Sequence, residues 1–326
     1  MAKKLKLKKN IKKILIIILL LIVCIYSSIK IYKNYKYKQT YEYKLINHGY
    51  TKKESQILLK NVYNQADVKF FLNHEINNKY IDITKEEYFI KRNYFDYINY
   101  LDENPNYLLK DIVRNINTHI NYDYYSMDFK TNTSKDYLML VNKYYLLDKT
   151  YIPNDLVYIS QKYAWGEKNS KQIRKIAYDA FVEMWNDAKN NQDFQFMINS
   201  SYRSYNDQND TYNLFKNKKG ITYADKIAAR PGASEHQTGL AIDIFSIKNS
   251  TKKDFENSPE ANWLCNNAYK YGFILRYPKG KENITGYSYE PWHYRYIGKK
   301  AASYCFKNDL TFDEYYAYFV ESKKKD

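Results

Sequence analysis

The sequence predicts an α+β protein, with a small, mainly antiparallel sheet flanked by helices, preceded by a membrane helix and a helical extension. Three observations predict it. Residues 14–29 are uncharged and follow a lysine-rich start. Helical periodicity then dominates residues 31–136. After that, short apolar strands mix with helices without the regular alternation that βαβ units would give.

The composition allows one catalytic domain and an extension. The chain has 326 residues, of which 44% are apolar, so it can form a sizeable core without disulfides. The net charge of +16 would suit a nucleic acid or a membrane, but eleven lysines lie in residues 1–40, which leaves +5 for the rest. No arginine-rich helix, zinc-finger spacing or aromatic ribonucleoprotein motif is present, so we expect no nucleic-acid partner.

The three cysteines, Cys24, Cys265 and Cys305, are not the even, closely spaced set of a disulfide scaffold. We expect them to be incidental. The alternative is a disulfide bridge between Cys265 and Cys305, which an environment outside the cytoplasm would allow. The distance between their Cα atoms decides whether it can form.

Residues 14–29, ILIIILLLIVCIYSSI, are expected to form a transmembrane anchor. The run is slightly shorter than the ~20 residues of a typical spanning helix, but flanking lysine side chains can extend to the interface. The basic tail 1–13 is expected in the cytoplasm and the chain after about residue 31 outside the cell. Ser27-Ser28 is a poor signal-peptidase site, so we expect a retained anchor, with cleavage as the alternative.

Residues 31–136 are predicted to form a helical, membrane-proximal extension that acts as a spacer or docking module. The segments TKKE at 51–54 and TKEE at 84–87 fit the capping box that starts a helix. A further helix is expected after the Asn-Pro pair at 104–105. Small polar residues at 131–135 mark the end of the extension.

The second domain is predicted over residues 137–310, followed by a C-terminal helix and basic tail at 311–326. Its elements follow from the periodicity of apolar residues and from Ser, Pro and Gly at their ends. The predicted helices span about 170–189 and 259–271, and the predicted strands span 194–198, 240–245, 273–277 and 292–296.

Three segments carry candidate chemistry: SSYRSYNDQ at 200–208, RPGASEHQTGLAIDI at 230–244 and EPWHYR at 290–295. Asp243 lies in an apolar strand, where a carboxylate is costly to bury unless it is paired or binds a metal. His236 follows a Pro-Gly turn, so its loop could fold back over that strand. A catalytic zinc takes three nitrogen or oxygen ligands at ~2.0–2.2 Å and leaves the fourth position to water. His293 would be the third ligand.

Glu290 precedes His293 by three residues, with Pro291 stiffening the link. This spacing places a carboxylate near the metal without requiring it to be a ligand. Such a group can take a proton from the attacking water and return it to the leaving amine. Glu290 is therefore the predicted general base.

Together, S-x-H-x6-D and E-x-W-H after S-x-Y-R-S-x3-Q resemble the VanY-type D-alanyl-D-alanine carboxypeptidases and the related L,D-carboxypeptidases, zinc enzymes that trim peptidoglycan stem peptides. The resemblance covers roughly residues 137–310. It implies that Arg203 binds the substrate carboxylate or the developing oxyanion, a role that suits a planar guanidinium. The other implied roles belong to metal ligands, a base and substrate contacts: Zn²⁺ on His236, Asp243 and His293, Glu290 as base, Gln208 and Ser234 on the substrate, and Trp292 on the wall of the site.

The resemblance implies hydrolysis of the terminal peptide bond of peptidoglycan stem peptides, with release of D-alanine outside the cell membrane. The alternatives are an L,D-carboxypeptidase, an endopeptidase that cuts cross-links, and a non-catalytic wall-binding module with a structural zinc. Glu290 argues against the last, because a structural zinc is normally closed by four protein ligands.

Overall fold

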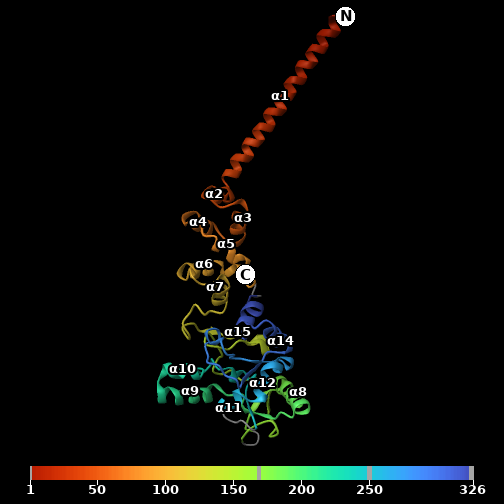
Figure 1. Cartoon of the computed structure of the whole chain (residues 1–326). Coiled ribbons are helices and arrows are strands. Elements are labelled where there is room, and N and C mark those ends of the chain that lie inside the picture. Colours follow the sequence, from red (N-terminus) through yellow and green to blue (C-terminus); the bar gives the residue numbers. More distant parts are fainter. Residues whose placement is uncertain (1, 167–169, 248–251, 323–326) are drawn as a thin grey trace. The chain divides into compact units, whose positions relative to one another are not determined.

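The chain divides into two compact units, Met1–Ile98 and Asn99–Asp326 (Figure 1). The computed structural model describes residues 2–166, 170–247 and 252–322 of them. Helices and small, mainly antiparallel sheets are mixed, which confirms the predicted α+β class. The two units are described separately below.

The first unit begins with α1 (Ala2–Lys38), drawn in red in Figure 1. Its part Ile11–Lys38 has a mean hydropathy of 2.8 and is the one helix, among the described residues, that is long and apolar enough to cross a membrane. Its large apolar side chains are exposed, Leu19 by 62%. These properties are consistent with the predicted anchor.

Short helices follow α1, as expected for the extension. They bury Leu45, Leu58, Phe71 and Ile83 completely. Their bounds are α2 (Tyr41–His48), α3 (Lys52–Asn61), α4 (Gln65–Asn73), α5 (Lys79–Asp82) and the start of α6 (Tyr94–Glu103).

One of the two predicted capping boxes forms. Thr51 Oγ1 accepts the N–H of Glu54, and the Glu54 carboxylate accepts the N–H of Thr51, at the start of α3. The second prediction, at 84–87, is wrong. Thr84 lies inside a 3₁₀ turn, Ile83–Lys85, and its hydroxyl donates to the carbonyl of Ile81, so it caps nothing that follows.

The second unit opens with the end of α6 and with α7 (Leu109–Asn117), the helix predicted after the Asn-Pro pair, although it starts four residues beyond Pro105. Two short strand pairs come next. They are parallel β1 (Phe129–Lys130) with β2 (Tyr145–Leu146), and antiparallel β3 (Leu156–Tyr158) with β4 (Gln172–Arg174).

The central sheet has four antiparallel strands in the order β5-β6-β8-β7. All four predicted strands are present, with ends displaced by one or two residues. The first begins later than expected because Phe194 still belongs to the preceding turn, where its N–H donates to the carbonyl of Ala188. The bounds are β5 (Phe196–Ser200), β6 (Ala241–Ser246), β7 (Phe273–Leu275) and β8 (His293–Tyr296).

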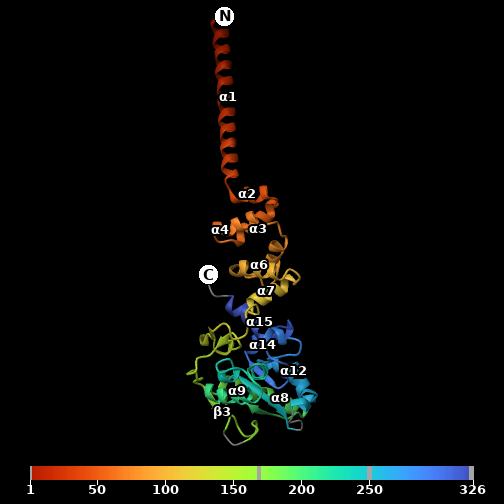
Figure 2. The ribbon, with the colours of Figure 1, turned by 90° about the vertical axis from the view of Figure 1, so that its left-hand side faces the viewer.

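Helices α8 (Lys175–Gln192) and α12 (Pro259–Asn267), both visible in Figure 2, pack with the sheet in the main core. The predicted start of α8 at 170 is wrong, because residues 172–174 pair with β3 instead. Ser258 caps α12 as expected, and Gly272 ends the 3₁₀ turn that follows it. Alternate strand residues point to opposite faces, so one face of β6 and β8 lies toward these helices and the other is left for the site.

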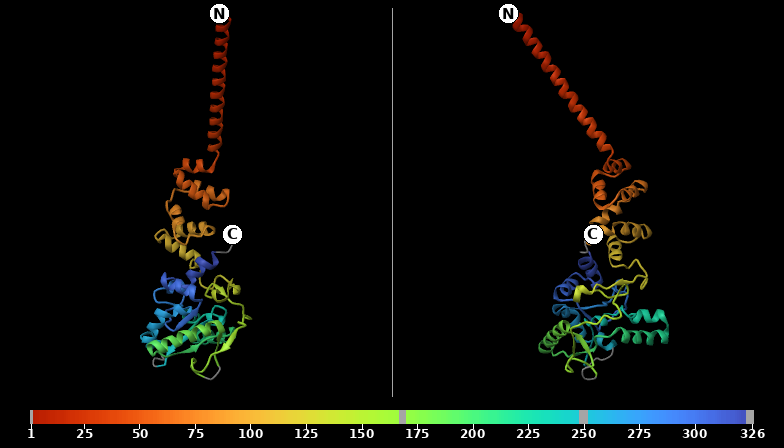
Figure 3. Two further views of the ribbon diagram at one scale, coloured as in Figure 1. Left: turned by 90° about the vertical axis from the view of Figure 1, so that its right-hand side faces the viewer. Right: turned by 180° about the vertical axis from the view of Figure 1, so that it is seen from behind.

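Helices α9 (Tyr205–Lys219) and α10 (Ile221–Ile227) form a hairpin that the sequence analysis did not predict. They lie side by side in the right-hand view of Figure 3. A capping box between Ser204 and Asp207 starts α9 directly after the Tyr-Arg motif.

The C-terminal segment contains α14 (Lys299–Lys307), α15 (Phe312–Tyr315) and a π-helical turn, Tyr316–Glu321. Phe312, Tyr316 and Val320 pack in one core cluster with residues of β2 and α14. The predicted basic tail lies at 323–326, outside the described residues. The predicted limits of the catalytic domain at 137 and 310 stay predictions.

Candidate metal centre

Asp243 and His293 are placed by the register of the sheet. They are partners in the antiparallel pair β6–β8. Their neighbours Ile242, Ile244 and Tyr294 lie in the main core, so both polar side chains leave the opposite face of the sheet. Nδ1 of His293 lies 3.0 Å from Oδ1 of Asp243.

His236 comes from a 3₁₀ turn, Glu235–Thr238, that leads into β6. Gly239 ends this turn at φ 65°, where a Cβ would lie 2.9 Å from a methyl group of Leu156, so the turn requires glycine. The Nδ1–H of His236 donates to the carbonyl of Ser201 at 2.8 Å. This bond leaves Nε2 as the lone-pair nitrogen, and Nε2 lies 3.6 Å from Oδ2 of Asp243.

The three predicted ligands therefore converge. One side-chain nitrogen or oxygen from each of His236, Asp243 and His293 lies within 4.8 Å of the other two. Two imidazoles and one carboxylate are a donor set that zinc accepts, and three protein ligands leave a position open. The hydrogen bond on the far nitrogen of His236 is the kind that orients a metal ligand. These residues fit the metal that the sequence predicts.

The pKa values of the two imidazoles shift in opposite directions, because burial dominates at His236 and neighbouring carboxylates dominate at His293. Burial lowers the pKa of His236 to about 4, which outweighs the attraction of Asp243. Burial would lower the pKa of His293 as well, but the neighbouring carboxylates of Asp243, Glu235 and Glu290 outweigh burial and raise the pKa to about 9. Negative charge is thus concentrated around His293, where a divalent cation would be stabilised.

A cavity of about 230 Å³ opens beside this cluster. Its wall holds every residue to which the sequence analysis gave a role: Arg203, Gln208, Ser234, His236, Asp243, Glu290, Trp292 and His293. Oε2 of Glu290 lies 3.8 Å from Nδ1 of His293, and 20% of its side chain is exposed. A carboxylate at the edge of the cluster and open to the cavity is where a general base belongs.

Arg203 also lines the cavity and is held there by two hydrogen bonds. Its Nη1 donates to Oε1 of Gln208 at 2.8 Å and its Nη2 donates to the hydroxyl of Ser200 at 3.0 Å. The amide of Gln208 donates in turn to the carbonyl of Ala229 at 2.7 Å. Both ends of the Gln208 side chain are therefore engaged, and it fixes the direction of the guanidinium.

Several residues of the site were missed by the sequence analysis. Tyr277 and Tyr287 line the cavity, and the ring of Tyr277 lies 4.9 Å from the imidazole of His293. Glu235 lies beside His236 in the chain, and its carboxylate approaches the far nitrogen of His293. Adjacency to a predicted ligand was the only available signal for Glu235, and tyrosine is too frequent in this chain to single out two.

A larger cavity, of about 530 Å³, lies elsewhere in the second unit between residues 128–133, 146–151, Tyr205 and Pro231. None of the residues that line it belongs to the candidate metal cluster or to the predicted catalytic residues. The chemistry therefore favours the smaller cavity as the active site.

Comparison with known proteins shows which family the chain resembles. Residues 170–299 match the family model of VanY, D-alanyl-D-alanine carboxypeptidase. The YodJ protein of Bacillus subtilis (strain 168) is 47% identical over 182 residues, a match that covers 55% of this chain and 66% of YodJ, just under two thirds of its length.

Two solved structures are also similar. The LdcB LD-carboxypeptidase is 44% identical with a TM-score of 0.55, and the match covers 58% of this chain and 89% of LdcB. A vancomycin-resistance D,D-pentapeptidase, VanY from a VanB-type cassette in complex with Zn(II), is 31% identical with a TM-score of 0.46, and the match covers 55% of this chain and 97% of that one.

Proposed function

The chain belongs to the VanY D-alanyl-D-alanine carboxypeptidase family, and from this premise we propose that it is a zinc-dependent carboxypeptidase that removes the C-terminal residue from peptidoglycan stem peptides. One observation carries the proposal: His236, Asp243 and His293 converge within 4.8 Å beside a cavity that also contains Glu290 and Arg203. A metal site, a base and a cation for a carboxylate are the three parts that this reaction needs.

The residues that would hold the zinc are His236 through Nε2, Asp243 through its carboxylate and His293 through Nδ1. A zinc ion there would supply a Lewis acid for the scissile carbonyl and make a water molecule acidic near neutral pH. Three ligands with an adjacent base favour catalysis over a structural role.

Glu290 and Arg203 perform the remaining steps. Glu290 takes the proton of the attacking water and delivers it to the leaving amine, because its carboxylate is near the ligands and open to the cavity. Arg203 pairs with the C-terminal carboxylate of the peptide, and Gln208 keeps its fork in position. Ser234 and Trp292 contact the peptide, with Trp292 stacked on Phe245 as part of the wall.

We favour D-alanyl-D-alanine as the bond that is cut, because the matching family model is that of a D-alanyl-D-alanine carboxypeptidase. The L,D-carboxypeptidase activity is a second candidate, supported by 44% identity to LdcB. An endopeptidase would need to accept a longer chain beyond the scissile bond.

The test is product analysis with purified full-length protein and synthetic stem peptides. A D,D-carboxypeptidase converts pentapeptide to tetrapeptide and stops, whereas an L,D-carboxypeptidase shortens the tetrapeptide. Cleavage of a cross-linked dimer would indicate an endopeptidase. If zinc-loaded protein cuts none of the three, the proposed activity is wrong and a wall-binding role takes its place.

We also propose that α1 anchors the protein in the cell membrane, with the N-terminal lysines in the cytoplasm and the catalytic unit outside. The apolar segment of α1 supports a membrane location. The proposed substrate supports the orientation, because peptidoglycan lies beyond the membrane.

A further inference from the structure

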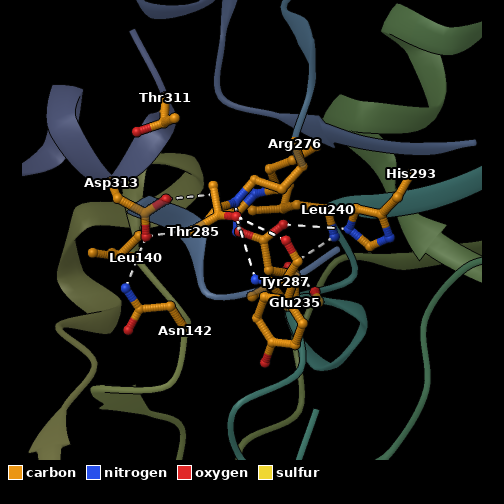
Figure 4. Close-up of polar contacts among 12 residues, drawn as sticks. Leu140, Asn142, Glu235, Leu240, Arg276, Thr285, Tyr287, His293, Thr311 and Asp313 are labelled. Carbon is orange, nitrogen blue, oxygen red and sulfur yellow. Dashed lines mark hydrogen bonds and ion pairs between the residues drawn. The ribbon is translucent and has the colours of Figure 1, made fainter. Parts of the chain in front are cut away.

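Glu235 carries a carboxylate that the proposed reaction does not use. The residue is 1% exposed, and its carboxylate approaches both Arg276 and His293 (Figure 4). Oε1 accepts hydrogen bonds from Nε of Arg276 at 2.8 Å and from Nη1 of Arg295 at 3.0 Å. Oε2 accepts none from the described residues and lies 3.5 Å from Nε2 of His293, itself buried and without a hydrogen bond.

The carboxylate stays ionised in this position. Oε1 pairs with two guanidinium groups, those of Arg276 and Arg295, and two such contacts stabilise the charged form of a carboxylate. An ionised carboxylate can only accept hydrogen bonds. The proton of the His293 imidazole is therefore favoured on Nε2, which faces Glu235, and the lone pair on Nδ1, which faces Asp243 and the metal position.

Glu235 is itself fixed by charges from distant parts of the chain. Arg276 is fully buried and donates to both oxygens of Asp313, at 2.6 and 3.1 Å. Asp313 also accepts a hydrogen bond from the amide of Asn142 at 2.8 Å. Arg295 donates to the carbonyl of Met139 at 2.7 Å. Two arginines and two carboxylates thus balance in charge inside the unit.

Asp313 lies outside the segment that matches the family model. That segment ends at residue 299, and Asp313 belongs to α15, which starts with a capping box between Thr311 and Glu314. The C-terminal helix therefore contributes a carboxylate that is connected to the metal cluster by a chain of contacts, from Asp313 to Arg276 and from Arg276 to Glu235.

We propose that Glu235 is a positioning residue that sets the tautomer and direction of His293 for metal binding, and that the Arg276–Asp313 pair holds Glu235 in place. This inference rests on the proposed zinc enzyme and names residues that act through its ligand. Carboxylates in this relation to a ligating histidine raise its basicity, and their loss typically weakens metal binding by roughly 10- to 100-fold.

The test compares metal binding by purified full-length protein in detergent. In Glu235→Gln the amide oxygen stays on the arginines, so the NH₂ group faces Nε2 of His293 and forces the ring proton to Nδ1. We expect the zinc dissociation constant, measured by competition with a chromophoric chelator, to rise roughly 10- to 100-fold. The visible spectrum of the cobalt-loaded protein should also change, because the ligand geometry changes.

Glu314→Gln is the matched control. Glu314 is also a buried glutamate and follows Asp313 directly in the chain. Its carboxylate accepts hydrogen bonds from Thr311 and none from Arg276 or Arg295. We expect this variant to lower the unfolding temperature while the zinc dissociation constant and the cobalt spectrum stay at wild-type values. A general loss of stability would affect both variants alike.

Asp313→Asn decides the question if Glu235→Gln does not fold, because Asp313 contacts no ligand. We expect a several-fold rise in the zinc dissociation constant with the fold intact. The inference would be overturned if folded Glu235→Gln kept the wild-type zinc affinity and cobalt spectrum. If Glu235→Gln does not fold, the same result in folded Asp313→Asn would overturn it. Failure of the wild-type protein itself to bind zinc would instead overturn the proposed function.

Discussion

Asp243 and His293 lie directly opposite each other on neighbouring antiparallel strands, with Nδ1 of the imidazole 3.0 Å from Oδ1 of the carboxylate. The sheet itself thus fixes two of the three proposed ligands relative to each other. A slip of one residue in this register would turn one of them into the core. Sites on strands are held more rigidly than sites on loops, so only His236 depends on a turn for its position.

The first prediction separates ligands from base. His236→Ala and His293→Ala should lose the zinc, whereas Glu290→Gln should keep it and lose turnover by roughly 10²- to 10⁴-fold, the usual contribution of a general base. Metal content by atomic spectroscopy and kcat on a stem peptide measure the two effects. Loss of zinc from a folded Glu290→Gln protein would show that Glu290 is a ligand.

The second prediction concerns Arg203. Arg203→Lys should lower kcat/KM by about 10- to 100-fold, because a charged hydrogen bond contributes roughly 1.5–3 kcal/mol and lysine lacks the planar fork. A peptide with a C-terminal amide provides the control. Wild-type protein should cleave the amide peptide poorly, and Arg203→Lys should lower kcat/KM for that peptide only slightly further. An equal loss on both peptides would mean that Arg203 does not bind the carboxylate.

The third prediction concerns the C-terminal core. Phe312 is fully buried and clusters with Tyr316 and Val320. Phe312→Ala should lower the unfolding free energy of a soluble 99–326 fragment by about 3–5 kcal/mol in urea. Phe306→Ala is the control, because Phe306 is 44% exposed, and should cost about 1 kcal/mol or less. Similar losses in both variants would indicate that the segment after 310 does not complete the core.

The fourth prediction is a pH dependence at Asp225. Burial raises the pKa of this carboxyl, but hydrogen bonds from Arg230 and Tyr212 outweigh burial and lower it. A lowered folded pKa means stability that is present above the ordinary value of about 4 and is lost as the pH falls through the folded value.

Asp225→Asn should therefore reduce the unfolding temperature of the protein at pH 7, and the difference from wild type should shrink as the pH falls below about 4. The effect should be about 1 kcal/mol or less, because Arg230 is 39% exposed. Asp179→Asn, which breaks an exposed pair with Lys175, should change little at either pH. A difference that does not shrink as the pH is lowered from about 4 until the protein unfolds would exclude the ion pair as its cause.

The fifth prediction concerns topology. Protease added to intact, wall-stripped cells should digest the catalytic unit without lysis, because the proposed substrate lies outside the membrane. A cytoplasmic protein that stays intact serves as the control for lysis. Protection of the catalytic unit until the membrane is opened would contradict both the orientation and the wall-trimming role.

Much of the fold follows from local pattern, and the prediction is wrong where another contact overrides that pattern. The four strands of the sheet and the helix after Ser258 were predicted because apolar periodicity and caps are written in adjacent residues. The start of α8 was missed because residues 172–174 pair with β3, a contact that no local pattern records. The second capping box does not form because the Thr84 hydroxyl donates to the carbonyl of Ile81 in the preceding turn.

The sequence by itself determined which residues could do chemistry: His236, Asp243, His293, Glu290 and Arg203 are the groups that a zinc peptidase needs, and their motifs identify them before any folding. Only the tertiary structure decided how His293 is oriented. Glu235, Arg276 and Asp313 lie 41 and 37 residues apart along the chain, and they meet because two buried charges of each sign must be paired when water is removed. Such pairing is a property of the packed interior, so no spacing in the sequence announces it.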